Sequence, residues 1–242
     1  MARLRLSLAV FSSCLVLFAS GVFSQSTFTF INQCSYPVWP GLLTGGGPSL
    51  PTTGFLLDSS DPTTVSIPAS WSGNLWGRTL CSTDANGQFT CATGDCGSGT
   101  IECCGNGPAS PITLFEITLD GPNGYDSYDV SLVNGFNVPM NVVTQGGNGN
   151  CGTVGCPTDI NAECPAELQV IGNGGGVVGC MSACEAFGGP TYCCNGPGKC
   201  STCGPTSYSE FFKSACPLAY SYACDGGPTS CDSPTYTITF CP

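Results

Sequence analysis

The sequence contains no histidine and very few basic residues. Its 242 residues include 5 lysines and arginines against 16 aspartates and glutamates, which gives a formal net charge of −11. Without histidine the chain cannot build a Ser-His-Asp or Cys-His catalytic group, or a zinc site that needs a histidine ligand. Acid–base chemistry must therefore use carboxylates, tyrosines or the few basic residues. So acidic a chain is a poor partner for nucleic acid, whereas a neutral polysaccharide is compatible with it.

Long apolar runs are also scarce, and the one present lies near the N-terminus. Arg3 and Arg5 precede a mostly apolar stretch at residues 8–18, and small residues follow it. The stretch is shorter than the roughly 20 residues that cross a membrane. This order is typical of a secretory signal peptide. We expect residues 1–24 to be removed, with cleavage after Gly21 as the alternative, and the mature chain to be soluble outside the cell.

Cysteine, in contrast, is abundant. Of the 20 cysteines, Cys14 leaves with the predicted signal peptide, so the mature chain keeps an odd number, 19. A secreted chain this rich in cysteine is typical of a disulfide framework. A zinc site or a redox site in the cluster Cys91–Cys104 is the less favoured alternative, and we expect no metal and no cofactor. The odd count predicts at least one cysteine that is free or bonded to another chain.

The first 145 residues have the alternating apolar pattern of short strands, separated by Gly, Pro and Ser clusters. This predicts an antiparallel sandwich. The expected strands are residues 26–33, 54–58, 64–68, 74–80, 111–119, 126–133, 136–143 and 235–240. Residues 151–216 hold ten cysteines, with helical spacing over 177–187 and a second short helix over 207–216. We expect this part to be a disulfide-held region of loops and short helices.

One predicted hairpin brings two acids together. Its turn is residues 120–124, and its arms are FEITL and YDVSL. Side chains alternate along a strand, so the apolar residues of each arm share one face. A turn centred between Pro122 and Asn123 pairs these apolar faces and sets Glu116 opposite Asp129. Directly opposed residues have Cβ atoms about 4.5–5.5 Å apart.

Two neighbouring carboxylates repel each other, and this repulsion raises the pKa of one of them. A protonated acid beside an ionised one is the arrangement that glycoside hydrolysis uses. Glu116 would then be the proton donor and Asp129 its charged partner. The simpler alternative is that both acids belong to the solvated face of a half-buried hairpin.

Several stretches together resemble the thaumatin-like proteins, also called pathogenesis-related group 5. GQFTCATGDCGSGTIEC at residues 87–103 resembles the family signature. Further similar segments are FINQCSYPVWPG, WGRTLC, VSLVNGFNVPM, YCCNGPGKCSTCGPTSYSEFFKSACP, AYSYACD and the terminal TFCP. The resemblance covers nearly all of residues 26–242.

The resemblance implies a mainly β fold with three parts and an acidic cleft between the first two. An antiparallel β-sandwich (domain I) would take residues 25–80, 108–155 and 217–242. A disulfide-rich domain II of loops and short helices would take 156–216, and a small disulfide-held domain III would take 81–107. It also implies eight disulfides: Cys34–Cys241, Cys81–Cys91, Cys96–Cys103, Cys151–Cys231, Cys156–Cys216, Cys164–Cys180, Cys184–Cys193 and Cys194–Cys203. Cys104, Cys200 and Cys224 are left over, and Cys200 could replace Cys203.

The family cleft carries an arginine, a glutamate and three aspartates. By resemblance Glu116, Asp129 and Asp225 match three of the four acids. Asn74 stands where the family often has arginine, and Asn134 where it usually has aspartate. The expected cleft is therefore acidic, but it lacks its internal cation. Arg78, two pleats from Asn74, is expected to be a structural partner for a carboxylate and not a substitute for the missing arginine.

These features predict a secreted, monomeric plant defence protein of the apoplast, antifungal in action, that binds cell-wall β-1,3-glucan or another polysaccharide in the acidic cleft. A weak endo-β-1,3-glucanase using Glu116 and Asp129 is one alternative. The other is an enzyme inhibitor or membrane-perturbing protein without sugar chemistry, whose partner would be a fungal surface protein or enzyme.

Overall fold

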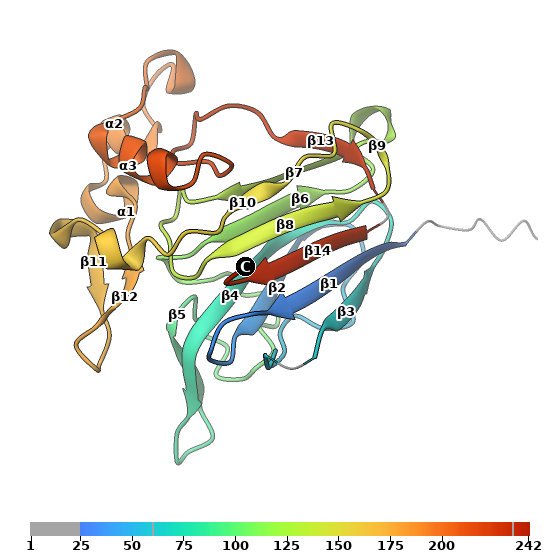
Figure 1. Ribbon diagram of the computed structural model, residues 1–242, viewed down its shortest axis with the longest axis horizontal. Coiled ribbons are helices and arrows are strands. Elements are labelled where there is room, and N and C mark those ends of the chain that lie inside the picture. Colours follow the sequence, from blue (N-terminus) through green and yellow to red (C-terminus); the bar gives the residue numbers. More distant parts are fainter. Residues whose placement is uncertain (1–24, 60, 234) are drawn as a thin grey trace, which may run out of the picture.

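Two β-sheets packed face to face form the larger part of the molecule, and short helices gather at one end (Figure 1). The computed structural model describes residues 25–59, 61–233 and 235–242, so the predicted signal peptide lies outside the described residues. The mainly β fold with a disulfide-rich helical part is confirmed. The three-domain division stays a prediction.

The strands of each sheet come from distant parts of the chain. The five-stranded sheet has the order β10 (Val154–Cys156), β8 (Met140–Gln145), β14 (Thr235–Phe240), β1 (Ser26–Asn32) and β3 (Thr63–Ile67). The seven-stranded sheet has the order β2 (Trp39–Gly46), β4 (Ser72–Thr83), β6 (Leu114–Thr118), β7 (Asp126–Ser131), β13 (Thr229–Asp232) and β9 (Asn148–Gly149), and β5 (Phe89–Thr93) pairs with the end of β4. Pairing is antiparallel except between β1 and β14, which run parallel. The expected strand at residues 54–58 is wrong, since it makes only isolated bridges.

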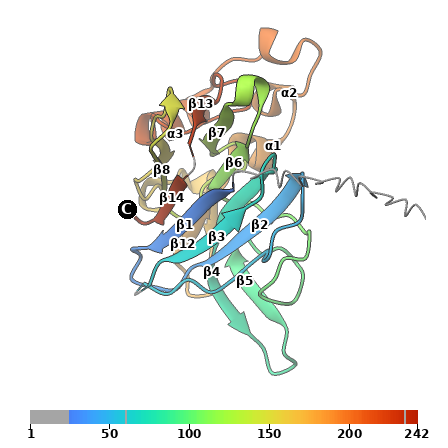
Figure 2. The same cartoon turned by 90° about the vertical axis from the view of Figure 1, so that its right-hand side faces the viewer.

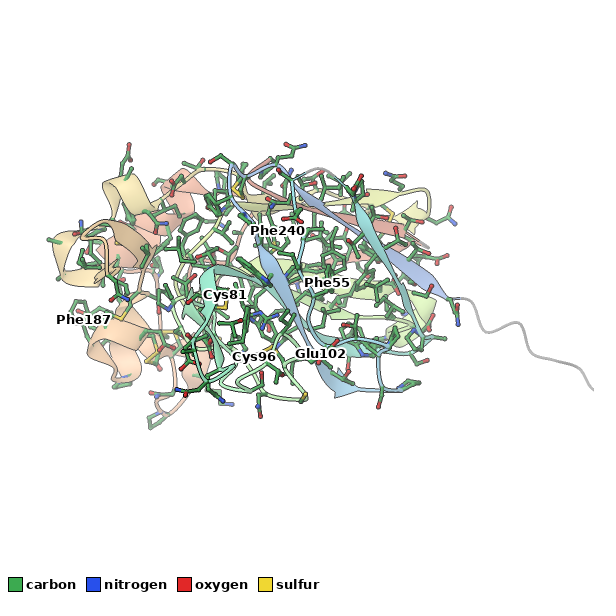
Figure 3. The ribbon with its side chains drawn as sticks, turned by 90° about the horizontal axis from the view of Figure 1, so that it is seen from below. Phe55, Cys81, Cys96, Glu102, Phe187 and Phe240 are labelled. Atoms are coloured by element: carbon green, nitrogen blue, oxygen red, sulfur yellow. A yellow bond between two sulfur atoms is a disulfide. The ribbon has the colours of Figure 1, made fainter. Side chains whose placement is uncertain are left out.

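The space between the sheets is filled by aromatic and aliphatic side chains. Phe28 of β1, Phe115 of β6 and Tyr236 of β14 lie with ring centroids 5.3–6.3 Å apart, which joins the two sheets directly. All three are fully buried. Figure 3 shows Phe55 and Phe240 within this sandwich, whereas Phe187 lies among the helices at the far end. Alternation along the strands thus buries one face of each sheet.

The helical end contains one small hairpin and several short helices. Its elements are β11 (Gln169–Ile171), β12 (Val177–Cys180), α1 (Ala183–Phe187), α2 (Pro190–Cys193), α3 (Ser207–Ala215) and the 3-10 turns η2 (Asn161–Glu163), η3 (Ala166–Leu168) and η4 (Lys199–Ser201); a further turn, η1 (Pro122–Gly124), closes the β6–β7 hairpin. The expected helix over 207–216 is confirmed as α3, which begins with a capping box on Thr206. None of the described helices is long and apolar enough to cross a membrane.

The expected helix over 177–187 is wrong in its first half. Residues 177–180 form β12, because they pair with β11 and because Cys180 exchanges two backbone hydrogen bonds with Phe136. The helix begins only at Ala183, where the Ser182 side chain accepts the Glu185 N–H. Tertiary pairing therefore overrides a helical spacing of apolar residues.

A small satellite core lies outside the sandwich, under the loops between β4 and β6. It contains Trp76, Cys96, Cys103, Ile112 and Leu114. Figure 2 shows β5 and the end of β4 extending away from the rest of the sheet on this side. The outer face of the seven-stranded sheet is thus covered near Trp76 and Leu114.

The Arg78 side chain links β2 to the loop that contains Ile101. Its guanidinium is buried and donates to the carbonyl oxygens of Trp39, Pro40 and Ile101 at 3.0, 3.1 and 2.7 Å. It also lies 5.4 Å from the centroid of the Phe89 ring. The expected carboxylate partner is therefore wrong: carbonyl groups of β2 and of the loop that contains Ile101 hold the cation. Arg78 is a structural residue, and none of its hydrogen bonds in the described chain reaches Glu116 or Asp129.

Nine disulfides join the described residues. All eight expected pairs are bonded, and a ninth joins Cys200 to Cys224. The alternative pairing of Cys200 with Cys194 is wrong, because Cys194 bonds Cys203. Cys104 is free and exposed.

The bonding of Arg78 predicts a large loss of stability on its removal. Arg78→Met leaves three carbonyl oxygens without their donor, so we expect the free energy of unfolding to fall by about 3 kcal/mol, roughly 1 kcal/mol for each. Urea unfolding with the disulfides intact measures this change. Arg78→Lys, which keeps the charge, should lose less. Wild-type stability in Arg78→Met would contradict the assigned role.

The disulfide count predicts the mass of the oxidised protein. Nine disulfides remove 18 hydrogens, and alkylation without reductant should label one thiol, Cys104. Intact-mass measurement tests both numbers. A bound zinc that a chelator removes, or a second reactive thiol in the native protein, would show the framework to be incomplete.

Candidate functional site

Three polar residues form a row across the outer face of the seven-stranded sheet. Asn74 of β4 lies opposite Glu116 of β6, and Glu116 lies opposite Asp129 of β7. All three are half-buried. The predicted register of the β6–β7 hairpin is thereby confirmed residue by residue. We call Glu116 and Asp129 the carboxylate pair.

The carboxylate pair faces outward because its neighbours in sequence face inward. Phe115 pairs with Val130 and Ile117 with Tyr128, and all four are buried in the sandwich core. A slip of one residue would move these apolar side chains to the outside and separate the acids. Burial of the apolar face therefore fixes the two carboxylates side by side.

Both carboxylates are harder to ionise than usual. Burial, and after it the neighbouring Glu116 charge, together raise the pKa of Asp129 from 3.8 to about 7. Burial also raises the pKa of Glu116, which a hydrogen bond from Ser131 partly offsets. Two neighbouring like charges do not both ionise easily, so the two carboxylates titrate as a coupled pair. The pKa of Asp129 is raised more than that of Glu116, whereas the sequence analysis predicted Glu116 as the proton donor.

Tyr220, which the sequence reasoning missed, lies beside the carboxylate pair. Its backbone pairs with β7, donating to the Val130 carbonyl at 2.8 Å and accepting the Leu132 N–H at 2.7 Å. Burial and the charges of Asp129, Asp225 and Glu116 raise the pKa of Tyr220 to about 12. Within the described chain, its hydroxyl and Oδ1 of Asp129 are buried without a hydrogen-bond partner. The AYSYACD segment, which resembles the family and contains both Tyr220 and Asp225, was the available sequence signal for Tyr220.

Asp225 belongs to the same region but is already engaged. Its Oδ2 accepts the backbone N–H of Ser221 at 2.8 Å and the Ser221 hydroxyl at 3.0 Å, and lies 3.0 Å from Nζ of Lys213. Lys213 therefore supplies a cation that the sequence comparison did not anticipate. It comes from α3, twelve residues away in sequence, and no spacing pattern could have found it.

Asn134, the remaining expected residue, has a structural contact. It follows β7, and its carbonyl accepts the Ile112 N–H at 3.1 Å. The structure gives no direct contact between its side chain and the carboxylate pair.

A cavity of about 250 Å³ borders the Asp225 side, lined by Lys213, Glu210, Tyr222 and Asp225 among others. A narrower cavity shares Ser209, Ser221 and Tyr222 with it. Glu116 and Asp129 line neither of these two cavities, so the single acidic cleft holding all five residues stays a prediction. In the described chain no three His, Cys, Asp or Glu residues are placed to hold a metal ion.

The raised pKa of Asp129 predicts a pH-dependent stability. The folded state binds more protons than the unfolded state between about pH 4 and 7, so wild-type stability falls as the pH rises through this window. Asp129→Asn removes the charge, and at pH 8 it should raise the free energy of unfolding by about 1–2 kcal/mol after solvent screening. At pH 3 the two proteins should be nearly equal.

Urea unfolding at both pH values measures the difference. Asp58→Asn, which removes an exposed carboxylate far from the pair in sequence, is the matched control and should show no such pH dependence. Equal stability of Asp129→Asn and wild type at pH 8 would show that Asp129 is not held in an unfavourable charged state.

The chain is similar to plant proteins over almost its whole length. It is 54% identical over 232 residues to "Thaumatin-like protein 1" of Prunus persica, covering 94% of each chain. It is 51% identical over 238 residues to "Glucan endo-1,3-beta-glucosidase" of Prunus avium, covering 96% of this chain and 97% of the relative. "Pathogenesis-related thaumatin-like protein 3.5" of Cryptomeria japonica is 48% identical over 246 residues, covering 100% and 99%. The family model described as "Thaumatin family" matches residues 32–242. The chain therefore belongs to the thaumatin family.

Proposed function

We propose that this protein is a secreted plant defence protein that binds a neutral cell-wall polysaccharide, β-1,3-glucan, on the face formed by Asn74, Glu116 and Asp129. The carboxylate pair carries this proposal. Two partly desolvated acids beside an amide offer several hydrogen-bond acceptors to sugar hydroxyl groups, and the amide adds donors. Hydrogen bonds from hydroxyl groups to a carboxylate are stronger than those between neutral groups.

Secretion and a place in the apoplast are part of the proposal. They rest on the N-terminal sequence pattern and on the disulfide framework, since nine disulfides persist in an oxidising compartment. The names of relatives include a pathogenesis-related protein, which agrees with a defence role.

Hydrolysis of the glucan is the second candidate, favoured by the raised pKa of Asp129 and by the name of the Prunus avium relative. It requires a proton donor and a separate ionised carboxylate or a base for water. The carboxylate pair meets the first need. Asp225 is paired with Lys213, and Asn134 cannot act as a base. We therefore expect binding with weak or absent cleavage.

The test measures retention and cleavage on the same substrate. Mature wild-type protein should be retained on insoluble β-1,3-glucan and release little reducing sugar. Replacing both acids, Glu116→Ala with Asp129→Ala, should weaken retention by about tenfold or more, the scale of one lost charge-assisted hydrogen bond. Glu116→Gln alone keeps the shape, so it should bind nearly as wild type and lose any residual cleavage.

The exposed Glu185 of α1 provides the matched control, because Glu185→Gln removes a carboxylate outside the site. It should behave as wild type. Robust cleavage by wild type would replace the binding proposal with catalysis. No retention on glucan would favour the third class, a protein that inhibits an enzyme or perturbs a membrane without sugar chemistry.

A further inference from the structure

The ninth disulfide ends at the residue that precedes Asp225 in the chain. Cys200 belongs to the turn η4, and Cys224 belongs to the segment between α3 and β13. Asp225 follows Cys224 directly in the chain. The disulfide therefore ties the backbone beside Asp225 to the helical end of the molecule.

The segment that it ties, residues 220–225, connects the carboxylate pair to the cavity described above. At its start Tyr220 is hydrogen-bonded to β7. At its end Asp225 holds Ser221 and Lys213. Ser221 and Tyr222 line both cavities, so any shift of this segment changes the shape of these cavities.

The disulfide is the covalent link at the Asp225 end of the segment. The ion pair between Lys213 and Asp225, whose side chains are 39% and 14% exposed, adds a partly screened contact to α3. The hydrogen bonds from Ser221 to Asp225 lie within the segment itself, so they do not anchor it to the rest of the molecule. The position of Asp225 thus depends on the Cys200–Cys224 bond together with the Lys213 ion pair.

One of the two cysteines of this disulfide, Cys200, is exposed to solvent. Cys200 is the only disulfide-bonded cysteine in the described residues that is exposed, and the others are buried or half-buried. Thiol–disulfide exchange requires that a thiolate reach one sulfur along the line of the S–S bond, so access decides which disulfide reacts first.

We propose that Cys200–Cys224 is a thiol-exchange site that accepts a small thiol of the glutathione type, and that its oxidised form positions Asp225 for polysaccharide binding. The thiolate attacks Sγ of Cys200, forms a mixed disulfide there, and Cys224 leaves as a thiolate that takes up a proton. A second thiol molecule attacks the mixed disulfide, which releases Cys200 as a thiol and the small molecule as its own disulfide. Two small thiols are oxidised and one protein disulfide is reduced.

Reduction removes the covalent link between residues 220–225 and the helical end, while the eight other disulfides keep the fold. This second half of the inference rests on the proposed function, because it predicts that polysaccharide binding weakens. The first half, the order in which disulfides react, does not depend on it.

The test begins with folded protein treated with increasing reduced glutathione and then trapped with iodoacetamide. Peptide mapping should show labels on Cys200 and Cys224 before any other disulfide-bonded cysteine. Retention on insoluble β-1,3-glucan should fall by about tenfold over the same range, the scale of one lost hydrogen bond to a charged group. Earlier labelling of any other pair would overturn the exchange site.

Two variants separate the causes. Cys200→Ser with Cys224→Ser should bind glucan as weakly as the reduced protein and should no longer respond to glutathione. Cys104→Ser, which removes the free thiol, is the control and should respond as wild type. Because reduction acts on folded protein, the labelling result decides the exchange site even if the double variant fails to fold.

The outcomes also separate this inference from the proposed function. If wild type does not bind glucan, the proposed function fails, and the labelling order still decides the exchange site. If wild type binds and the double variant binds equally well, the positioning role of the disulfide is wrong although the proposed function holds.

Discussion

The register in which β6 pairs with β7 is the constraint on which the candidate site depends. It is fixed by the inward face, where Phe115 meets Val130 in the sandwich core. The same register sets the pairing on the outward face, so Glu116 and Asp129 lie side by side although their charges repel. Core packing offsets the repulsion between the two carboxylates: burying a large apolar side chain contributes about 1.5–3 kcal/mol, and several such side chains together exceed the free energy of the raised Asp129 pKa.

A second layer of constraint comes from parts of the chain that surround the sheet. The satellite core covers the outer face near Trp76, and the segment that begins at Tyr220 borders it on the other side. These flanks withdraw water from the carboxylate pair, and burial is the main cause of its raised pKa values. The proposed polysaccharide binding uses this arrangement, because hydroxyl groups of a sugar can replace the missing water as hydrogen-bond donors.

Much of the sheet, including the β6–β7 register, could be predicted from sequence, because period-two alternation and a turn with Gly and Pro are local signals. The contacts that the sequence did not predict join residues that are far apart in the chain. Arg78 donates to carbonyl groups of β2 and of the loop that contains Ile101, Lys213 reaches Asp225 from a helix, and Cys200 bonds Cys224, which is 24 residues away in sequence. Residues 177–180 look helical by spacing and become a strand because Phe136 offers backbone partners. None of these pairings corresponds to a periodic pattern of residues in the sequence.

The most direct test of this account is a carbon-13 NMR titration of the side-chain carboxyl groups of Glu116 and Asp129 in the folded protein. The shared environment predicts two separated steps, the higher one near pH 7, each sensed by both carboxyl carbons because the two groups are coupled. Asp129→Asn should return Glu116 to a single step at lower pH. Two independent titrations near pH 4 would contradict the claim that the sheet holds the two carboxylates as one proton-sharing pair.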